Sequence, residues 1–201
     1  GTPYSGLSSI SRPHTRFGTG FRDLNNDGYL DLYMANGKVR LPDTIESDDP
    51  YAERNVLIKG LPNGKFEEVS NGSMMHTSRG IAYGDVNGDG AVDILVVNRD
   101  APAYLLMNQN PDSGGFIKLQ LLNEHGAPAQ DAVVRFKLGE RSLRREVRSG
   151  GGYCSAHEQV VHIGIGDEER VSELEITWSG GTIQKVGDIV AGETRTIHQA
   201  K

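Results

Sequence analysis

Two stretches decide the fold of this 201-residue chain: Asp23-Leu-Asn-Asn-Asp-Gly-Tyr-Leu-Asp31 and Asp85-Val-Asn-Gly-Asp-Gly-Ala-Val-Asp93. The second repeats the first at an offset of 85 − 23 = 62 residues. Both follow the pattern D-x-N-x-D-G-x-x-D, which places side-chain oxygens at loop positions 1, 3, 5 and 9 and a glycine at position 6, where a tight turn is needed. Hard oxygen ligands at this spacing are typical of Ca²⁺ sites, and Mg²⁺, which demands a near-octahedral shell, fits less well.

The loops differ from EF-hand loops, which carry a bidentate glutamate at position 12 between two helices. Position 12 is Met34 in one copy and Val96 in the other, and residues 29–35 and 91–98 are rich in β-branched, aromatic and leucine residues. We therefore expect a buried strand after each loop. The alternative is a pair of ordinary hairpin turns with solvated carboxylates. Two copies with all four ligand positions matched favour the metal loops.

The sequence between the loops predicts strands and tight turns. Residues 55–66 indicate a hairpin with an Asn63-Gly64 turn, and residues 79–84 lead back to the second loop. Each period is thus a small antiparallel sheet that buries its faces by stacking on neighbours. These features resemble the FG-GAP or VCBS repeats of β-propellers, as in integrin α subunits. The resemblance covers residues 16–108, including Gly18, Phe66 and the run from Gly80 to Asp93.

The resemblance implies two calcium sites. The side-chain ligands it implies are Asp23, Asn25, Asp27 and Asp31 in the first loop, and Asp85, Asn87, Asp89 and Asp93 in the second. The loop spacing adds a backbone carbonyl at position 7, from Tyr29 or Ala91, and water would complete the shell. It also implies a partial β-propeller, because a closed propeller has four to eight blades and only two loops are present. Further blades are expected upstream or from a partner chain.

A second module is predicted after the turn-forming cluster at residues 110–115, which gives the domains 1–110 and 111–201. Period-two strands separated by glycine-rich turns predict a small antiparallel β-sandwich or barrel-like domain. The expected strands are residues 116–122, 132–138, 142–148, 160–165, 174–178 and 194–198. The whole chain is therefore expected to be all-β.

This second module resembles the ASPIC/UnbV domain of cartilage acidic protein-like proteins and their bacterial homologues, some of which are encoded in enediyne pathways. The segments that carry the match occur in the order Gly126-Ala, Val147-Arg-Ser-Gly-Gly-Gly-Tyr-Cys-Ser155, His162-Ile-Gly-Ile-Gly166 and Trp178-Ser-Gly-Gly181. The segment Gln130-Asp-Ala-Val-Val134 and the absence of a proline after Trp178 depart from the family pattern. The resemblance implies no catalytic role.

Composition excludes several classes of protein. The chain has 21 basic and 27 acidic residues, for a net charge of −6, which argues against nucleic-acid binding. No apolar run is long enough to span a membrane. The lone Cys154 cannot form an internal disulfide framework. A first residue other than Met indicates a piece of a longer protein, and the polar, proline-containing residues 38–54 predict a long surface loop.

We expect a non-enzymatic, calcium-binding adhesion, recognition or scaffold module that takes a protein or carbohydrate ligand and works in a secreted, periplasmic or cell-surface location. The alternative is an accessory protein or enzyme of a biosynthetic pathway with a site between the two modules. Two clusters bear on that alternative, Cys154 with His157 and the trio Arg144, Arg145 and Arg148. The first could be a thiol nucleophile and the second could bind an anionic ligand, but a semi-buried structural cysteine and a solvated strand face are the favoured interpretations. A calcium sensor is disfavoured because the loops join strands.

Overall fold

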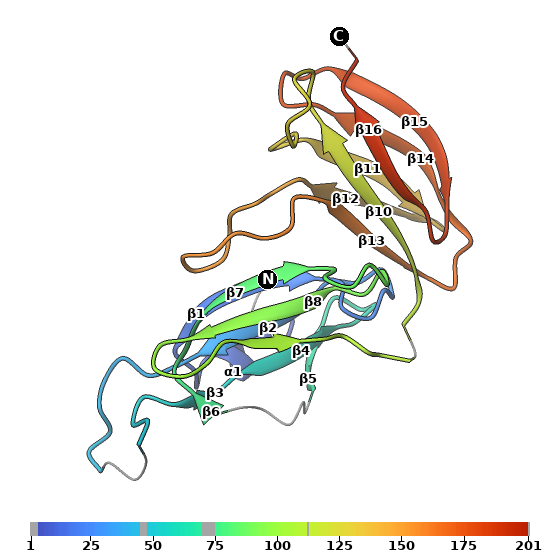
Figure 1. Ribbon diagram of the computed structural model, residues 1–201. Coiled ribbons are helices and arrows are strands. Elements are labelled where there is room, and N and C mark those ends of the chain that lie inside the picture. The colour runs from blue at the N-terminus through green and yellow to red at the C-terminus, as the bar shows by residue number, and fades with distance from the viewer. Residues whose placement is uncertain (1–3, 45–47, 70–74, 112, 201) are drawn as a thin grey trace.

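The computed structural model describes residues 4–44, 48–69, 75–111 and 113–200. Its secondary structure is 49% strand and 3% helix, arranged in several mainly antiparallel sheets, and within the described residues no sheet closes on itself. The all-β expectation is confirmed. Figure 1 shows two groups of strands, here called the N-terminal module (β1–β9) and the C-terminal module (β10–β16).

The N-terminal module contains a short helix, α1 (Leu7–Ser11), and three sheets with the strand orders β1-β2-β4-β5, β7-β8-β9 and β3-β6. Its strands are β1 (Arg16–Arg22), β2 (Asp31–Asn36), β3 (Glu53–Arg54), β4 (Val56–Gly60), β5 (Phe66–Val69), β6 (Met75–His76), β7 (Ser78–Gly84), β8 (Asp93–Asn98) and β9 (Tyr104–Leu106). The predicted hairpin is the β4–β5 pair, whose Asn-Gly turn places Gly64 at φ 74°.

Strand β2 is buried along its whole length because it packs on both faces. Tyr33 and Ala35 join a core with residues of β7 and β8, whereas Leu32 and Met34 join a second core with β4 and residues of α1. The position-12 residues Met34 and Val96 are 1% and 0% exposed, as the sequence predicts. A strand buried on both faces explains why this segment is almost continuously apolar.

The C-terminal module is a sandwich of two sheets with the orders β13-β10-β16 and β12-β11-β14-β15. Its strands are β10 (Gly115–Leu122), β11 (Val133–Leu138), β12 (Arg141–Glu146), β13 (Val161–Gly166), β14 (Arg170–Thr177), β15 (Ile183–Val190) and β16 (Thr194–His198). Side chains from both sheets form one core, in which Trp178 is 2% exposed. The alternation of inward apolar and outward polar residues builds this core.

Two features of the C-terminal module differ from the sequence expectation. Strand β16 pairs with β10 in parallel, so the module is not purely antiparallel. Strand β15 was not expected, because it is an edge strand whose burial pattern is mostly exposed and whose apolar signal is therefore weak. Gly187, at φ 88°, lies in β15 where its pairing with β14 is irregular.

The segment between β9 and β10 crosses from one module to the other and contains the predicted domain boundary, of which residue 112 lies outside the described residues. Residues 38–44 are mostly exposed, as expected for a surface loop, and residues 45–47 also lie outside the described part. Among the described residues, no helix has the length and apolar character needed to cross a membrane.

Candidate functional site

The first repeated loop joins β1 to β2 and folds around its own aspartates. Asp23 accepts hydrogen bonds from the backbone N–H groups of Asp27 (3.1 Å) and Gly28 (2.8 Å), and Asp27 accepts one from Tyr29 (2.9 Å). Gly28 has φ 83°, a conformation that favours glycine. These side-chain to backbone bonds are why aspartate at positions 1 and 5 and glycine at position 6 give this turn.

Asp31, at position 9, closes the first loop and ties it to the next hairpin. Its two carboxylate oxygens accept the backbone N–H groups of Leu24 at 2.9 Å and Gly60 at 2.9 Å. Asp31 is 3% exposed and Asp23 is 1% exposed. The loop therefore holds two buried carboxylates, and both are hydrogen-bonded to backbone.

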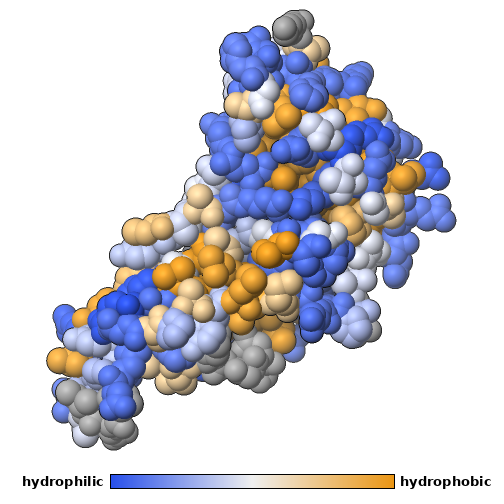
Figure 2. Space-filling view, in the orientation of Figure 1, coloured by the Kyte–Doolittle hydropathy of each residue, from blue (hydrophilic) through white to orange (hydrophobic). Residues whose placement is uncertain are grey.

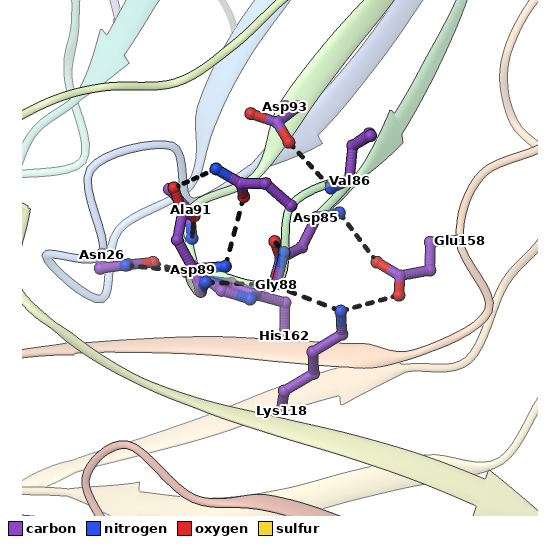
Figure 3. A network of polar contacts seen from close by, with 12 residues as sticks. Asn26, Asp85, Val86, Gly88, Asp89, Ala91, Asp93, Lys118, Glu158 and His162 are labelled. Carbon is purple, nitrogen blue, oxygen red and sulfur yellow. Dashed lines mark hydrogen bonds and ion pairs between the residues drawn. The ribbon is translucent and has the colours of Figure 1, made fainter.

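The second loop joins β7 to β8 and repeats this pattern (Figure 3). Asp85 accepts from Gly88 (2.7 Å) and Gly90 (3.0 Å), and Asp89 accepts from Ala91 (2.8 Å). Asp93 accepts from Val86 and Asn108, both at 2.8 Å. The two copies therefore share a local fold as well as a sequence.

The aspartates of the first loop destabilise one another's charged forms. Burial, followed by repulsion from Asp27, raises the pKa of Asp23 to about 7. Burial also raises the pKa of Asp31, and Asp27 adds to that rise. A bound cation would remove this repulsion, and carboxylate, amide and carbonyl oxygens are the ligands that Ca²⁺ takes. The donor chemistry of the loop therefore fits a calcium ion.

The predicted ligands are close in each loop, but they are not turned toward a common point. Within the described residues, no three His, Cys, Asp or Glu side chains form a group that could hold a metal ion. Asn25 donates its amide N–H to Asp27 at 2.8 Å, and Asn87 donates to Asp89 at 2.7 Å. A cation would instead be bound through the amide oxygen at position 3.

Lysines that the sequence analysis did not single out lie beside both loops. Lys59 Nζ lies 3.6 Å from Asp27 Oδ2. Lys118, on β10 of the C-terminal module, lies 3.4 Å from Asp85 Oδ2 and 2.8 Å from Glu158 Oε1 (Figure 3). These ammonium groups supply part of the positive charge that the carboxylates need.

Asn26, at position 4 of the first loop, links both loops to the C-terminal module. Its amide nitrogen donates to the Gly90 carbonyl at 3.2 Å, and its amide oxygen lies 2.7 Å from Nε2 of His162 on β13. The backbone N–H of Gly166 donates to the Asn26 carbonyl at 2.6 Å. Burial lowers the pKa of His162 to about 4, so the imidazole is neutral at physiological pH and can donate to Asn26.

The cysteine and histidine that could have formed a nucleophilic pair have different surroundings. Cys154 is exposed, which corrects the expectation of a semi-buried cysteine, and its φ of 51° places it in a turn. His157 is 7% exposed, and its Nδ1 accepts the backbone N–H of Tyr83 at 3.4 Å. The imidazole lone pair is thus engaged away from the thiol.

Comparison with known proteins identifies both segments. The family described as FG-GAP-like repeat matches residues 23–96, and the family described as ASPIC and UnbV matches residues 123–201. The chain is 26% identical to cartilage acidic protein 1 of Xenopus tropicalis over 174 residues, which cover 80% of this chain and 25% of that protein. It is 24% identical to cartilage acidic protein 1 of Homo sapiens over 182 residues, which cover 87% of this chain and 26% of that protein. The chain thus spans about a quarter of the length of these relatives.

Proposed function

Because this chain is an FG-GAP-like repeat protein with a C-terminal ASPIC and UnbV segment, we propose that it is an extracellular recognition or adhesion module whose two loops bind structural Ca²⁺. The combination of segments and the names of the relatives support the extracellular, recognition-type role. Recognition requires exposed contact surface, and the N-terminal module has it: Leu95, Val97 and Leu105 are between 39% and 46% exposed. Figure 2 shows apolar side chains gathered over this module.

The observation that carries the calcium proposal is the similar hydrogen bonding of the two loops around acidic side chains: in both, the position-1 aspartate accepts the N–H of the position-6 glycine. Asp23, Asn25, Asp27, Asp31 and the Tyr29 carbonyl would hold one ion. The equivalent residues of the second loop, Asp85, Asn87, Asp89, Asp93 and the Ala91 carbonyl, would hold the other. When bound, Ca²⁺ supplies positive charge at the ends of the strands that each loop joins.

A structural role follows from where the loops lie. The first loop contacts β13 through Asn26, and the second contacts β10 through Lys118, so both loops take part in the junction between the modules. An ion that orders the first loop would also order its contact with β13, whereas an ion at Asp85 would compete with Lys118. Binding to the folded state alone stabilises it by about 2.7 kcal/mol per site at a hundredfold excess of calcium over Kd.

The test is thermal unfolding with and without a chelator, combined with calorimetric titration of Ca²⁺. We expect two ions per chain and a lower melting temperature in chelator. Asp27→Ala should leave one ion, whereas Asp167→Ala, which removes an exposed acidic residue outside both loops, should leave two. An unchanged melting temperature together with no detectable calcium binding contradicts the proposal.

The alternative, an accessory protein or enzyme with a site between the modules, is favoured by one observation. Arg144, Arg145 and Arg148 line a cavity of about 340 Å³ between the two modules. Cys154 and His157 are not among the residues that line it. The arrangement therefore supports ligand binding at the junction without the Cys154 and His157 pair.

A further inference from the structure

The cavity between the two modules has apolar and cationic walls. Phe21 and Arg22 of β1 and Tyr83 of β7 line it from the N-terminal module, and Arg144 and Arg145 of β12 line it from the C-terminal module. Its volume of about 340 Å³ lies within the range of small-molecule sites. Both modules must be in place to form it.

The acidic residues of the cavity already have partners. The lining contains four arginines, Arg22, Arg144, Arg145 and Arg148, and three acidic residues, Asp23, Glu146 and Glu158. Glu146 pairs with Arg144 and with Arg148, each at 2.8 Å. Glu158 pairs with Lys118 at 2.8 Å, and Asp23 accepts backbone N–H groups of its own loop. Of the four arginines, Arg22 and Arg145 are the two that pair with none of these acidic residues.

Arg22 and Arg145 have no ion-pair partner within 4 Å among the described residues. Each donates from Nη1 to a backbone carbonyl: Arg22 to Phe21 at 2.8 Å and Arg145 to Arg144 at 3.1 Å. The Nε and Nη2 atoms of Arg145 are buried, and in the described part of the chain they have no hydrogen-bond partner. Asp23 is the acidic residue whose charge acts on Arg145, and Arg22 lies 5.2 Å from the centre of the Tyr83 ring, so neither guanidinium group makes a direct ion pair with a described residue.

We propose that this cavity binds a small organic anion, whose carboxylate group is held by Arg145 from the C-terminal module and Arg22 from the N-terminal module. A guanidinium group offers paired N–H donors in the planar geometry that a carboxylate accepts. Phe21, Leu30 and Val160 provide an apolar wall for the rest of such a molecule. The site would give the recognition module a specific ligand class, and it does not require calcium.

The experiment is a titration of the ¹⁵N-labelled protein with sodium benzoate, which carries a carboxylate on an apolar body, and separately with sodium sulfate, a bare oxyanion. Chemical shifts of the Arg Nε–H groups report binding, at constant ionic strength because chloride screens weak anion binding. We expect benzoate to shift the Arg145 resonance with saturation, and sulfate to bind at least tenfold more weakly. Each titration is run with calcium and with a chelator, so that failure of the calcium proposal does not mimic failure of this one.

Matched variants locate the site. Arg145→Gln should weaken benzoate binding at least tenfold, and Arg22→Gln, from the other module, should weaken it at least fivefold. Arg170→Gln, which changes an arginine with 56% side-chain exposure at the far strand β14, should leave affinity within twofold. If Arg145→Gln fails to fold, Arg22→Gln decides the question. Absence of saturable benzoate binding by the unmodified protein, or equal affinity in Arg22→Gln and Arg170→Gln, overturns the proposal.

Discussion

Gly164 lies where the first loop touches the C-terminal module, and Gly164→Ala should push the loop away from that module. It is a buried residue of β13, paired with Phe116 of β10. A Cβ atom there would lie 2.5 Å from the Cα and 2.6 Å from the carbonyl carbon of Asn26, and closer still to Asp23 Oδ2. Ordinary contacts of a Cβ begin near 3.4 Å, so the loop would have to retreat by about 1 Å.

The cost can be worked out from the hydrogen bonds that cross this contact. They join Gly166 N to Asn26 O at 2.6 Å, Gly114 N to Asn25 O at 3.0 Å, and His162 to the Asn26 amide oxygen at 2.7 Å. A retreat of about 1 Å takes all three beyond hydrogen-bonding distance. At about 1 kcal/mol each, their loss should lower the free energy of unfolding by about 3 kcal/mol.

The assay is urea unfolding, followed by far-ultraviolet circular dichroism and by the fluorescence of Trp178, the single tryptophan. Gly180→Ala is the matched control, because a Cβ at Gly180 meets no atom within 4 Å. It should change stability by less than about 0.5 kcal/mol. If Gly164→Ala unfolds at the same urea concentration as Gly180→Ala, the loop does not rest on β13 and the reasoning is refuted.

Two further predictions concern buried charge. Burial lowers the pKa of His157 to about 4, below its ordinary value of 6.5, so the unfolded chain binds the proton first as pH falls. The free energy of unfolding should therefore decline between about pH 6.5 and 4, by about 2 kcal/mol at pH 5. Urea unfolding at several pH values measures this decline. The contribution of His157 should be lost in His157→Gln and retained in His125→Gln, which changes an exposed histidine. Lys118→Met should destabilise the protein in chelator by about 1–2 kcal/mol, because it leaves the carboxylate of Asp85 without its cation. Lys137→Met, which breaks an exposed pair, should cost less than about 0.5 kcal/mol in the same unfolding assay; equal losses would contradict the role given to Lys118.

Local patterns predicted the loops, the strands that follow them and the buried position-12 residues Met34 and Val96, because each of these depends on neighbours in sequence. The hydrogen bonds that shape each loop join residues no more than seven positions apart; the long-range ones are those that Asp31 and Asp93 accept from Gly60 and Asn108 and those that Asn26 makes to the second loop and to the C-terminal module. The FG-GAP-like and ASPIC and UnbV resemblances are confirmed by the family matches. The boundary between residues 110 and 111 and the propeller arrangement stay predictions.

The contacts that join the modules could not be predicted, because they bring together residues far apart in sequence. Asp85 meets Lys118, and Asn26 meets His162, and no local period marks either pair. A signal for Asn26 did exist: position 4 is Asn in one loop and Gly88 in the other, and both have positive φ, at 57° and 76°. Asparagine is one of the few residues that tolerate this conformation, and its amide can then bond to a neighbour.

The same comparison explains why the two repeats, alike in sequence, have different surroundings. In the first loop Asn26 and Gly28 are buried against the C-terminal module, and Arg141 stacks 4.1 Å above the ring of Tyr29. In the second loop Gly88 and Asp89 are exposed. A cation in the first loop would lie against the C-terminal module, whereas one in the second loop would lie beside exposed residues. Calcium binding at the first loop should therefore be linked to the docking of the modules, and binding at the second should depend mainly on competition with Lys118.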